Sequence, residues 1–90
     1  MSLPISVPLK FARQYKLQWE TAQDAWVLLY PEGLIKLTGS AGEILKRIDG
    51  RSSVEDIVSN LQAAFPEADL QQDVIDFLEH AHDKGWITAD

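Results

Sequence analysis

The chain has 90 residues, of which 46% are hydrophobic, no cysteine, and a formal net charge of −6. So short a chain forms one domain with a thin core, and none of its apolar runs approaches the roughly 18 residues that a membrane span needs. We therefore expect a soluble cytoplasmic protein without a membrane segment, disulfides or thiolate metal sites.

The first part of the chain is expected to be an extended, loosely held arm over residues 1–14. Pro4 and Pro8 lie in this segment, and proline removes a backbone donor and favours extended backbone. A single folded domain is expected over residues 15–90.

Three strands are predicted next. In the first, Tyr15, Leu17 and Trp19 alternate with polar residues. The second, residues 25–30, is rich in β-formers. The third, residues 34–38, follows a type I turn at Pro31 and Gly33. A half-solvated sheet alternates apolar and polar residues, but residues 28–37 are apolar at nearly every position. Either the chain's own segments cover both faces, or another molecule completes the sheet.

Three helices follow, each with a residue that can cap its start and a glycine or proline at its end. The predicted capping pairs are Ser40 with Glu43, Ser52 with Glu55 and Asp69 with Gln72, and the predicted stops are Asp49-Gly50, Pro66 and Gly85. On the third helix the apolar residues Leu70, Val74, Phe77, Leu78 and Ala81 form one stripe, opposite a row of acids.

The order of these elements predicts an α+β domain: a three-stranded antiparallel sheet followed by a three-helix bundle and a short Trp86-Ile87 tail. This outline resembles winged helix-turn-helix proteins. A DNA-binding function is disfavoured by charge, because residues 52–90 carry nine Asp and Glu against one Lys. The acidic half favours a basic partner surface, although a plain solvated face is the simpler interpretation.

No catalytic or metal-binding constellation is found in the sequence. His80 and His82 are two residues apart on a predicted helix, so their side chains diverge and do not form a metal pair. The serines at helix starts are explained by capping, and no glycine-rich phosphate loop is present. We expect neither an enzyme nor a protein with a cofactor of its own.

The sequence also carries stretches typical of a known family. These are Val27-Leu-Leu-Tyr-Pro-Glu-Gly33, Lys36-Leu37, Ser40-Ala41, Glu43-Ile44-Leu45, Asp49-Gly50, Asp73-Val74, Phe77-Leu78 and Gly85-Trp86-Ile87. From about Pro8 to Ile87 the chain resembles the pyrroloquinoline quinone (PQQ) biosynthesis protein D family (PqqD), which belongs to the recognition elements of ribosomally synthesised, modified peptides (RiPPs).

The resemblance implies a non-catalytic peptide chaperone. Such a protein holds the precursor peptide PqqA and presents it to the radical S-adenosylmethionine (SAM) enzyme PqqE, to which the iron–sulfur chemistry belongs. In relatives of this fold the leader segment of the peptide lies between the third strand and the third helix and adds a strand to the sheet. The alternatives are an interaction module for another protein partner and, less favoured, a nucleic-acid regulator.

The resemblance and the apolar third strand together predict a peptide-binding groove. Its residues are expected to be Leu34, Ile35, Lys36 and Leu37 at the sheet edge, with Gln71, Ile75 and His82 as the helical wall and Leu78 at the floor. Asp76, Glu79 and Asp83 are expected to contact the enzyme partner. In the competing interpretation Ile75 and Leu78 are ordinary core residues, Leu34 packs under the N-terminal arm, and His82 is a partly exposed surface histidine. The apolar edge also predicts homodimers formed through the sheet.

Overall fold

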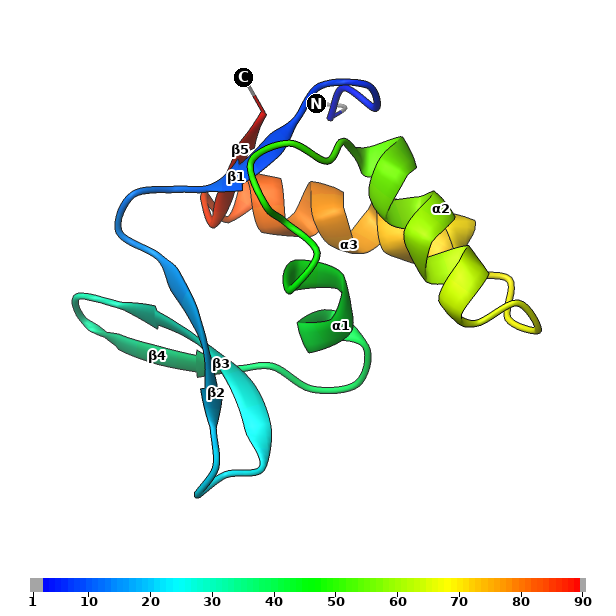
Figure 1. Cartoon of the computed structure of the whole chain (residues 1–90). Helices are drawn as coiled ribbons and strands as arrows, with labels where there is room; N and C mark the ends of the chain where they lie inside the picture. The colour runs from blue at the N-terminus through cyan, green and yellow to red at the C-terminus, as the bar shows by residue number, and fades with distance from the viewer. Residues whose placement is uncertain (1–2, 90) are drawn as a thin grey trace.

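Two antiparallel sheets and three helices are present in the computed structural model, which describes residues 3–89 (Figure 1). The elements in chain order are β1 (Leu9–Phe11), β2 (Lys16–Glu20), β3 (Ala25–Tyr30), β4 (Gly33–Lys36), α1 (Ala41–Leu45), α2 (Val54–Ala64), α3 (Gln71–Asp83) and β5 (Ile87–Ala89). A three-stranded sheet followed by three helices confirms the predicted α+β class.

Strands β2, β3 and β4 form the predicted antiparallel meander. Leu28 of β3 lies opposite Leu17 of β2 and Ile35 of β4. A turn of two residues that begins at Pro31 joins β3 to β4. Because proline presets one backbone angle of the turn, this short connection fixes the register of the hairpin. β4 ends at Lys36, two residues earlier than the sequence predicts.

The two faces of this sheet are covered to different extents. Trp26 and Ile35 lie on the face that packs against the helical core, and Leu28 on the same face is fully buried. On the opposite face Val27 is also buried, whereas Leu34 is 45% exposed. The chain's own segments therefore leave a large apolar side chain open to solvent on the strand at the sheet edge.

The N-terminal segment belongs to the fold, and the expectation of a loosely held arm is wrong for the residues that are described. β1 pairs antiparallel with β5, with Leu9 opposite Ala89. Leu9 is fully buried, and its backbone exchanges hydrogen bonds of 2.9 and 3.0 Å with the loop before α2. Burial of Leu3 and Leu9 stabilises this segment in spite of its prolines. The predicted Trp86-Ile87 tail accordingly leads into β5, which begins at Ile87.

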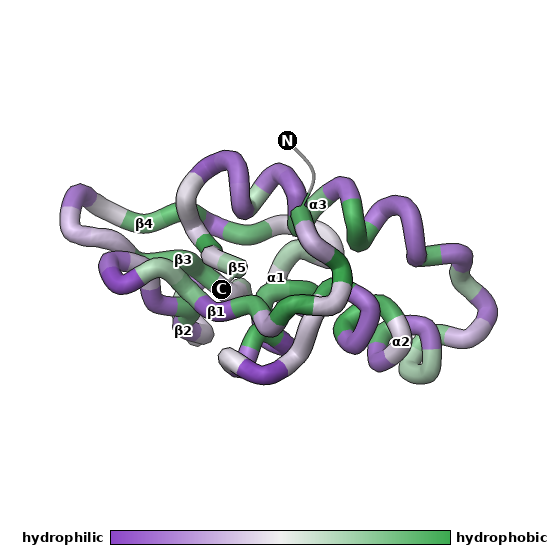
Figure 2. The backbone as a smooth tube through the Cα atoms, turned by 90° about the horizontal axis from the view of Figure 1, so that it is seen from above, coloured by the Kyte–Doolittle hydropathy of each residue, from purple (hydrophilic) through white to green (hydrophobic). Residues whose placement is uncertain are grey.

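The core lies where the three helices meet the β1–β5 sheet. Its largest fully buried side chains include Leu9, Leu45, Ile57, Leu78 and Ile87, one from each of these five parts of the fold. Figure 2 shows α1 below α3 and between the main sheet and α2, so that the small helix α1 connects the two halves of the molecule.

Helix α2 begins with a capping box one residue later than predicted. The Ser53 hydroxyl accepts the backbone N–H of Asp56 at 3.2 Å, and the Asp56 carboxylate accepts the backbone N–H of Ser53 at 3.0 Å. The predicted pair, Ser52 with Glu55, is wrong because Asp49 holds Ser52 in the preceding loop, where its carboxylate accepts the Ser52 N–H at 2.8 Å. Capping satisfies helix N–H groups that have no partner within the helix.

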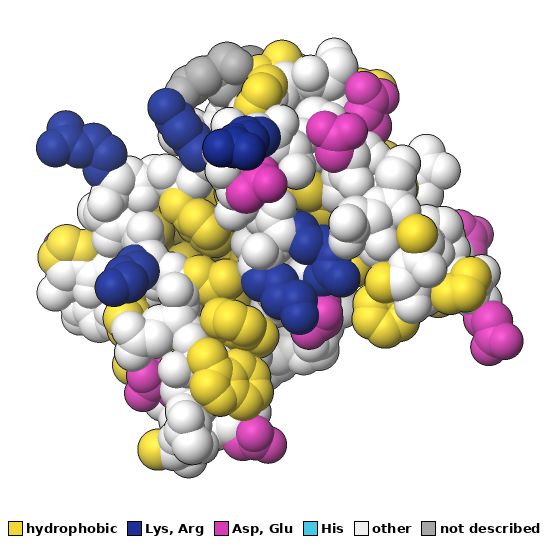
Figure 3. Space-filling view, in the orientation of Figure 1, with side chains coloured by type: hydrophobic (Ala, Val, Ile, Leu, Met, Phe, Trp, Pro, Cys, Tyr) yellow, Lys and Arg dark blue, Asp and Glu magenta, His cyan; other side chains and the backbone are white. Residues whose placement is uncertain are grey.

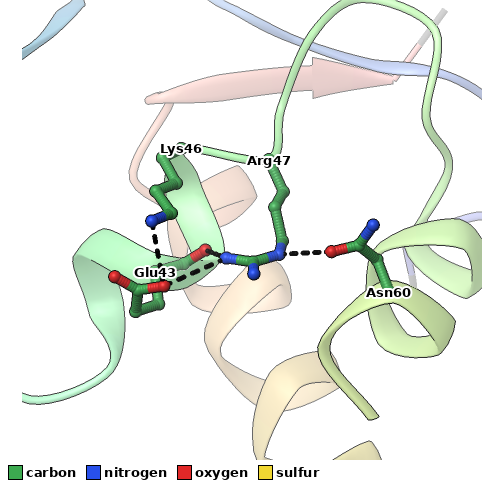
Figure 4. Close-up of polar contacts among 4 residues, drawn as sticks. All are labelled: Glu43, Lys46, Arg47 and Asn60. Atoms are coloured by element: carbon green, nitrogen blue, oxygen red, sulfur yellow. Dashed lines mark hydrogen bonds and ion pairs between the residues drawn. The ribbon is translucent and has the colours of Figure 1, made fainter. Parts of the chain in front are cut away.

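The predicted capping box of α1 is not formed. Ser40 precedes the helix but makes no side-chain cap bond. Glu43 instead pairs with Lys46 at 3.1 Å and Arg47 at 3.2 Å, and Arg47 also donates to Asn60 of α2 at 2.6 Å (Figure 4). These cations compete successfully for the Glu43 carboxylate, and Arg47 fastens the end of α1 to α2.

The third helix also starts without the predicted side-chain cap. Leu70 is its N-cap residue, Asp69 makes no cap bond, and the Gln72 side chain donates to Asp76 at 2.8 Å. The predicted stop at Gly85 is confirmed: its φ of 80° is a left-handed conformation that glycine adopts without strain.

Candidate peptide-binding site

Strand β4 is an edge strand. The order of the main sheet is β2-β3-β4, and no second strand within residues 3–89 pairs with the outer side of β4. Viewed from above, β4 forms the edge of the main sheet that is nearer to α3, and β2 forms the far edge (Figure 2). An unpaired edge of this kind presents backbone donors and acceptors to an extended peptide.

The hydrogen-bond pattern tells which groups of β4 face outward. Leu37 donates its backbone N–H to the carbonyl oxygen of Trp26 at 3.0 Å, so its donor points toward β3. Because the bonding direction alternates along an antiparallel strand, Ile35 also bonds to β3, whereas Leu34 and Lys36 direct their N–H and C=O groups away from it. The free edge therefore offers two N–H and two C=O groups.

The side chains of β4 divide between the two faces of the sheet. Leu34 and Lys36 are exposed, whereas Ile35 is half-buried and Leu37 is buried among core residues. The structure thus brings the four predicted edge residues together in space, but only two of them present both backbone and side chain to solvent.

On α3, the predicted wall residues have other neighbours. Gln71 and Ile75 line a hollow of about 280 Å³ with Ile5 and residues of α2. His82, half-buried, shares this flank of the helix by its spacing from Ile75. Leu78, the predicted floor, is fully buried in the core. The flank that carries Gln71, Ile75 and His82 therefore faces the N-terminal segment and α2.

The opposite flank of α3 carries an aromatic cluster that includes Phe77, a residue that the sequence pattern places in the core stripe. Its ring lies 6.4 Å from that of His80, and the His80 ring lies edge-on to Trp86 at 5.6 Å. Phe77 is only half-buried. Farther along the same flank, Asp73 lines a hollow together with Ser40, which follows β4 in the chain. The helical period predicts that these α3 residues lie on one flank, but the sequence does not reveal which part of the chain each flank contacts.

The three acids expected to contact the enzyme partner do not share one environment. Asp76 and Asp83 are exposed, although Asp76 accepts the Gln72 bond, and Glu79 accepts the backbone N–H of Leu3 at 3.3 Å. Glu79 therefore also holds the N-terminal segment against α3.

The part of the chain that the structure describes contains neither a metal-ion cluster nor a helix that could span a membrane. Within residues 3–89 no three His, Asp or Glu side chains gather in a way that would hold a metal ion. None of the described helices combines the length and apolar character of a membrane span.

A second apolar surface lies at the other edge of the main sheet, on β2. Trp19, predicted to be on a buried face, is 45% exposed, and its ring lies edge-on to Trp26 at 5.5 Å. Figure 3 shows hydrophobic side chains gathered over the front of the molecule, next to Lys and Arg side chains. Neither Trp19 nor Trp26 was among the predicted site residues.

Comparison with known proteins places this architecture in a family. The family model described as coenzyme PQQ synthesis protein D (PqqD) matches residues 25–87. A protein of Pseudomonas paraeruginosa named PqqA binding protein is 52% identical over 90 residues, which cover 97% of each chain. Another protein of this name, from Acinetobacter baylyi, is 53% identical over 78 residues, covering 86% of this chain and 79% of its own length.

The fold matches a solved structure as well. A solution NMR structure of the PqqD truncation of Methylobacterium extorquens PqqCD, described as a RiPP recognition element, superposes with a TM-score of 0.71 at 24% identity. It covers 89% of this chain and 87% of its own. The names of the relatives describe binding and not catalysis. The matched family model and the extent of these identities establish that the chain belongs to the coenzyme PQQ synthesis protein D (PqqD) family.

Proposed function

We propose that this protein binds the precursor peptide PqqA by strand addition at β4 and presents it to the radical SAM enzyme PqqE in the cytoplasm. The observation that supports this most directly is the outward direction of the Leu34 and Lys36 backbone groups on an unpaired edge. The choice of PqqA as the peptide rests on the relatives, which are named PqqA binding protein.

The energetics suit a carrier that must release its peptide. Four added-strand hydrogen bonds at ~1 kcal/mol each, with two or three buried peptide side chains at ~1.5–3 kcal/mol each, stabilise the complex by roughly 7–13 kcal/mol. Association and ordering oppose this by several kcal/mol, which leaves dissociation constants from roughly 0.1 to tens of micromolar. Most of the discrimination between peptides must then come from side-chain contacts, to which Leu34 and Lys36 contribute on the β4 side.

We assign the second wall of the groove to the Phe77 flank of α3. The flank predicted from sequence, with Gln71, Ile75 and His82, is partly occupied by the N-terminal segment through Ile5 and the Leu3–Glu79 hydrogen bond. A peptide would have to displace that segment to reach it. Phe77 takes part neither in the hollow lined by Ile5 nor in the Leu3–Glu79 hydrogen bond.

Titration with a synthetic PqqA leader peptide, followed by residue-resolved amide shifts, tests the peptide proposal. We expect the largest shifts along residues 33–38 and on the Phe77 flank of α3. Shifts confined to β2 or to the helices would contradict strand addition at β4. An unrelated peptide of the same length and charge serves as the control.

The acidic surface of α3 is the proposed contact for the enzyme. Replacing Asp76 and Asp83 by lysine tests this without disturbing Glu79, which holds Leu3. We expect association with PqqE to weaken while binding of PqqA is unchanged. Unaltered association with the enzyme would contradict the assignment.

The β4 edge would also pair with the edge of a second copy, because its free groups are not specific for peptide. We propose that such dimers form at high protein concentration and that PqqA competes with them. Sedimentation at increasing concentration, with and without peptide, measures this competition; dimers that persist at saturating peptide would use another surface.

A further inference from the structure

A hollow of about 250 Å³ lies where α1, the end of α2 and the start of α3 meet. Its apolar lining includes Ile44, Leu61, Leu70 and Val74. Phe65, which also lines it, is 46% exposed. An exposed aromatic ring beside an apolar hollow is a feature of surfaces that are covered by a partner.

One wall of this hollow is rigid. The loop between α2 and α3 is tied to a single side chain: Gln62 donates to the carbonyl oxygens of Phe65 and Ala68 at 3.2 and 2.6 Å, and accepts the N–H of Leu70 at 3.4 Å. A loop held by three such bonds keeps its shape without a ligand, so little ordering opposes binding.

The volume limits what the hollow can hold. A cavity of about 150 Å³ is enough for benzene, whereas pockets for drug-sized ligands and cofactors begin at about 300 Å³. The hollow of about 250 Å³ thus has the size for one large apolar side chain and is small for a cofactor.

The charges around the hollow are acidic. Glu43 and Asp73 line it, and Glu67 and Asp69 lie in the adjoining loop. Glu43 is paired with Lys46 and Arg47, but Asp73 makes no ion pair within residues 3–89. The uncompensated charge is therefore on the α3 side, where it attracts a cation.

We propose that this hollow binds a peptide segment in which one large apolar side chain stands next to a lysine or arginine. The apolar side chain enters between Leu61 and Val74, and the cation lies by Asp73. This hollow and the β4 edge are formed by different residues, although Ser40 and Asp73 of the hollow also flank the proposed groove. The proposal for the hollow therefore does not depend on strand addition at β4.

Three capped hexapeptides test the proposal on the whole chain by residue-resolved amide shifts. The first, Gly-Ser-Trp-Lys-Ser-Gly, should shift residues 61–74; the second has Glu in place of Lys, and the third has Ser in place of Trp. We expect the second and third to bind at least about tenfold more weakly, which corresponds to ~1.4 kcal/mol. The difference between the first two should shrink at high salt. Equal binding of all three, or shifts on β4 only, would overturn the proposal.

Variants with matched controls test the location. Ala68→Trp, at an exposed lining position, should fill the entrance and abolish the shifts, whereas Ala63→Trp on the exposed side of α2 should not. Asp73→Lys should weaken binding of the Trp-Lys peptide at least about tenfold, and Asp83→Lys should leave this binding unchanged. Binding that survives Ala68→Trp would refute the assignment. Titration of Ala68→Trp with the PqqA leader reports separately on the β4 edge, so failure of one proposal does not imply failure of the other.

Discussion

The backbone of Gly42 in α1 lies against the indole ring of Trp26 in β3. A Cβ atom added to Gly42 would lie 2.5 Å from Cδ1 of Trp26, nearer than such atoms approach in real structures. Trp26 belongs to the main sheet and Gly42 to helix α1. This contact therefore fixes the position of the main sheet relative to α1.

Gly42→Ala is therefore expected to destabilise the protein even though alanine favours helix. Overpacking costs about 1–3 kcal/mol and the helix preference of alanine offsets up to about 1 kcal/mol, which leaves a net loss of about 1 kcal/mol. Urea unfolding measures the loss. The double variant Gly42→Ala with Trp26→Leu should show a coupling above about 0.5 kcal/mol, and strict additivity would contradict a direct contact.

Proline substitutions on β4 distinguish its inner from its outer hydrogen-bonding side. Lys36→Pro removes a donor that faces outward, so the fold should persist while PqqA binding falls at least about tenfold. Ile35→Pro removes a donor to β3 and should lower the unfolding midpoint. Lys36→Ala, which keeps the N–H, is the control for loss of the side chain. Full binding by a folded Lys36→Pro variant would show that the peptide does not use this donor.

The two serines at helix starts should differ in their contribution to stability. Ser53→Ala removes a hydroxyl that caps α2 and is expected to cost about 1 kcal/mol. Ser40→Ala removes a hydroxyl without a cap bond and should change stability by less than about 0.5 kcal/mol. Thermal unfolding of both variants tests the contrast, and equal losses would contradict the assigned caps.

Asp49 should contribute to the loss of stability in acid. Backbone hydrogen bonds from Arg51 and Ser52 hold the pKa of its carboxyl below the ordinary value of 3.8. A carboxyl with a lowered pKa stabilises the fold at pH values above the ordinary one, and this contribution is lost as the pH falls through the lowered value. Asp49→Asn keeps the acceptor oxygen but does not titrate, so its stability should fall less steeply below pH 3.8. Parallel urea-unfolding curves for the variant and the unchanged protein over this pH range would contradict the prediction.

The two flanks of α3 should respond differently to substitution. Phe77→Leu is expected to weaken PqqA binding about three- to tenfold, because it removes an aromatic contact from the proposed wall. Ile75→Ala should leave binding unchanged, since this side chain faces the N-terminal segment and α2. Calorimetric titration of both variants, after confirming that each is folded, measures the difference. The reverse order of effects would support the wall predicted from sequence.

The main sheet was predictable from the alternation in β2 and from a proline turn between two runs of β-formers, and α3 was predictable from a helical period over several turns. Alternation around Trp19 and the Pro31 turn predicts the meander, and the stripe from Val74 to Ala81 predicts the buried face of α3. β1 and β5 have three residues each, too few for a period to appear, and their pairing joins the two ends of the chain.

The misplaced caps have a local cause. Ser52 and Ser53 are adjacent and both can cap a helix, so the choice between them depends on Asp49, which holds the first in the loop. In the candidate site, too, the sequence pattern does not reveal which segments of the chain are neighbours. Helical spacing groups Gln71, Ile75 and His82 on one flank, but only the folded chain reveals that Ile5 lies next to that flank.

The β1–β5 pairing has a consequence for how this protein can be joined to others. Since Leu9 lies opposite Ala89, β1 and β5 lie side by side, and Figure 1 shows both strands well apart from β4. A tag or a whole enzyme fused beyond β5 would start from that distant corner. Genetic tethering beyond β5 should thus be compatible with peptide capture at β4.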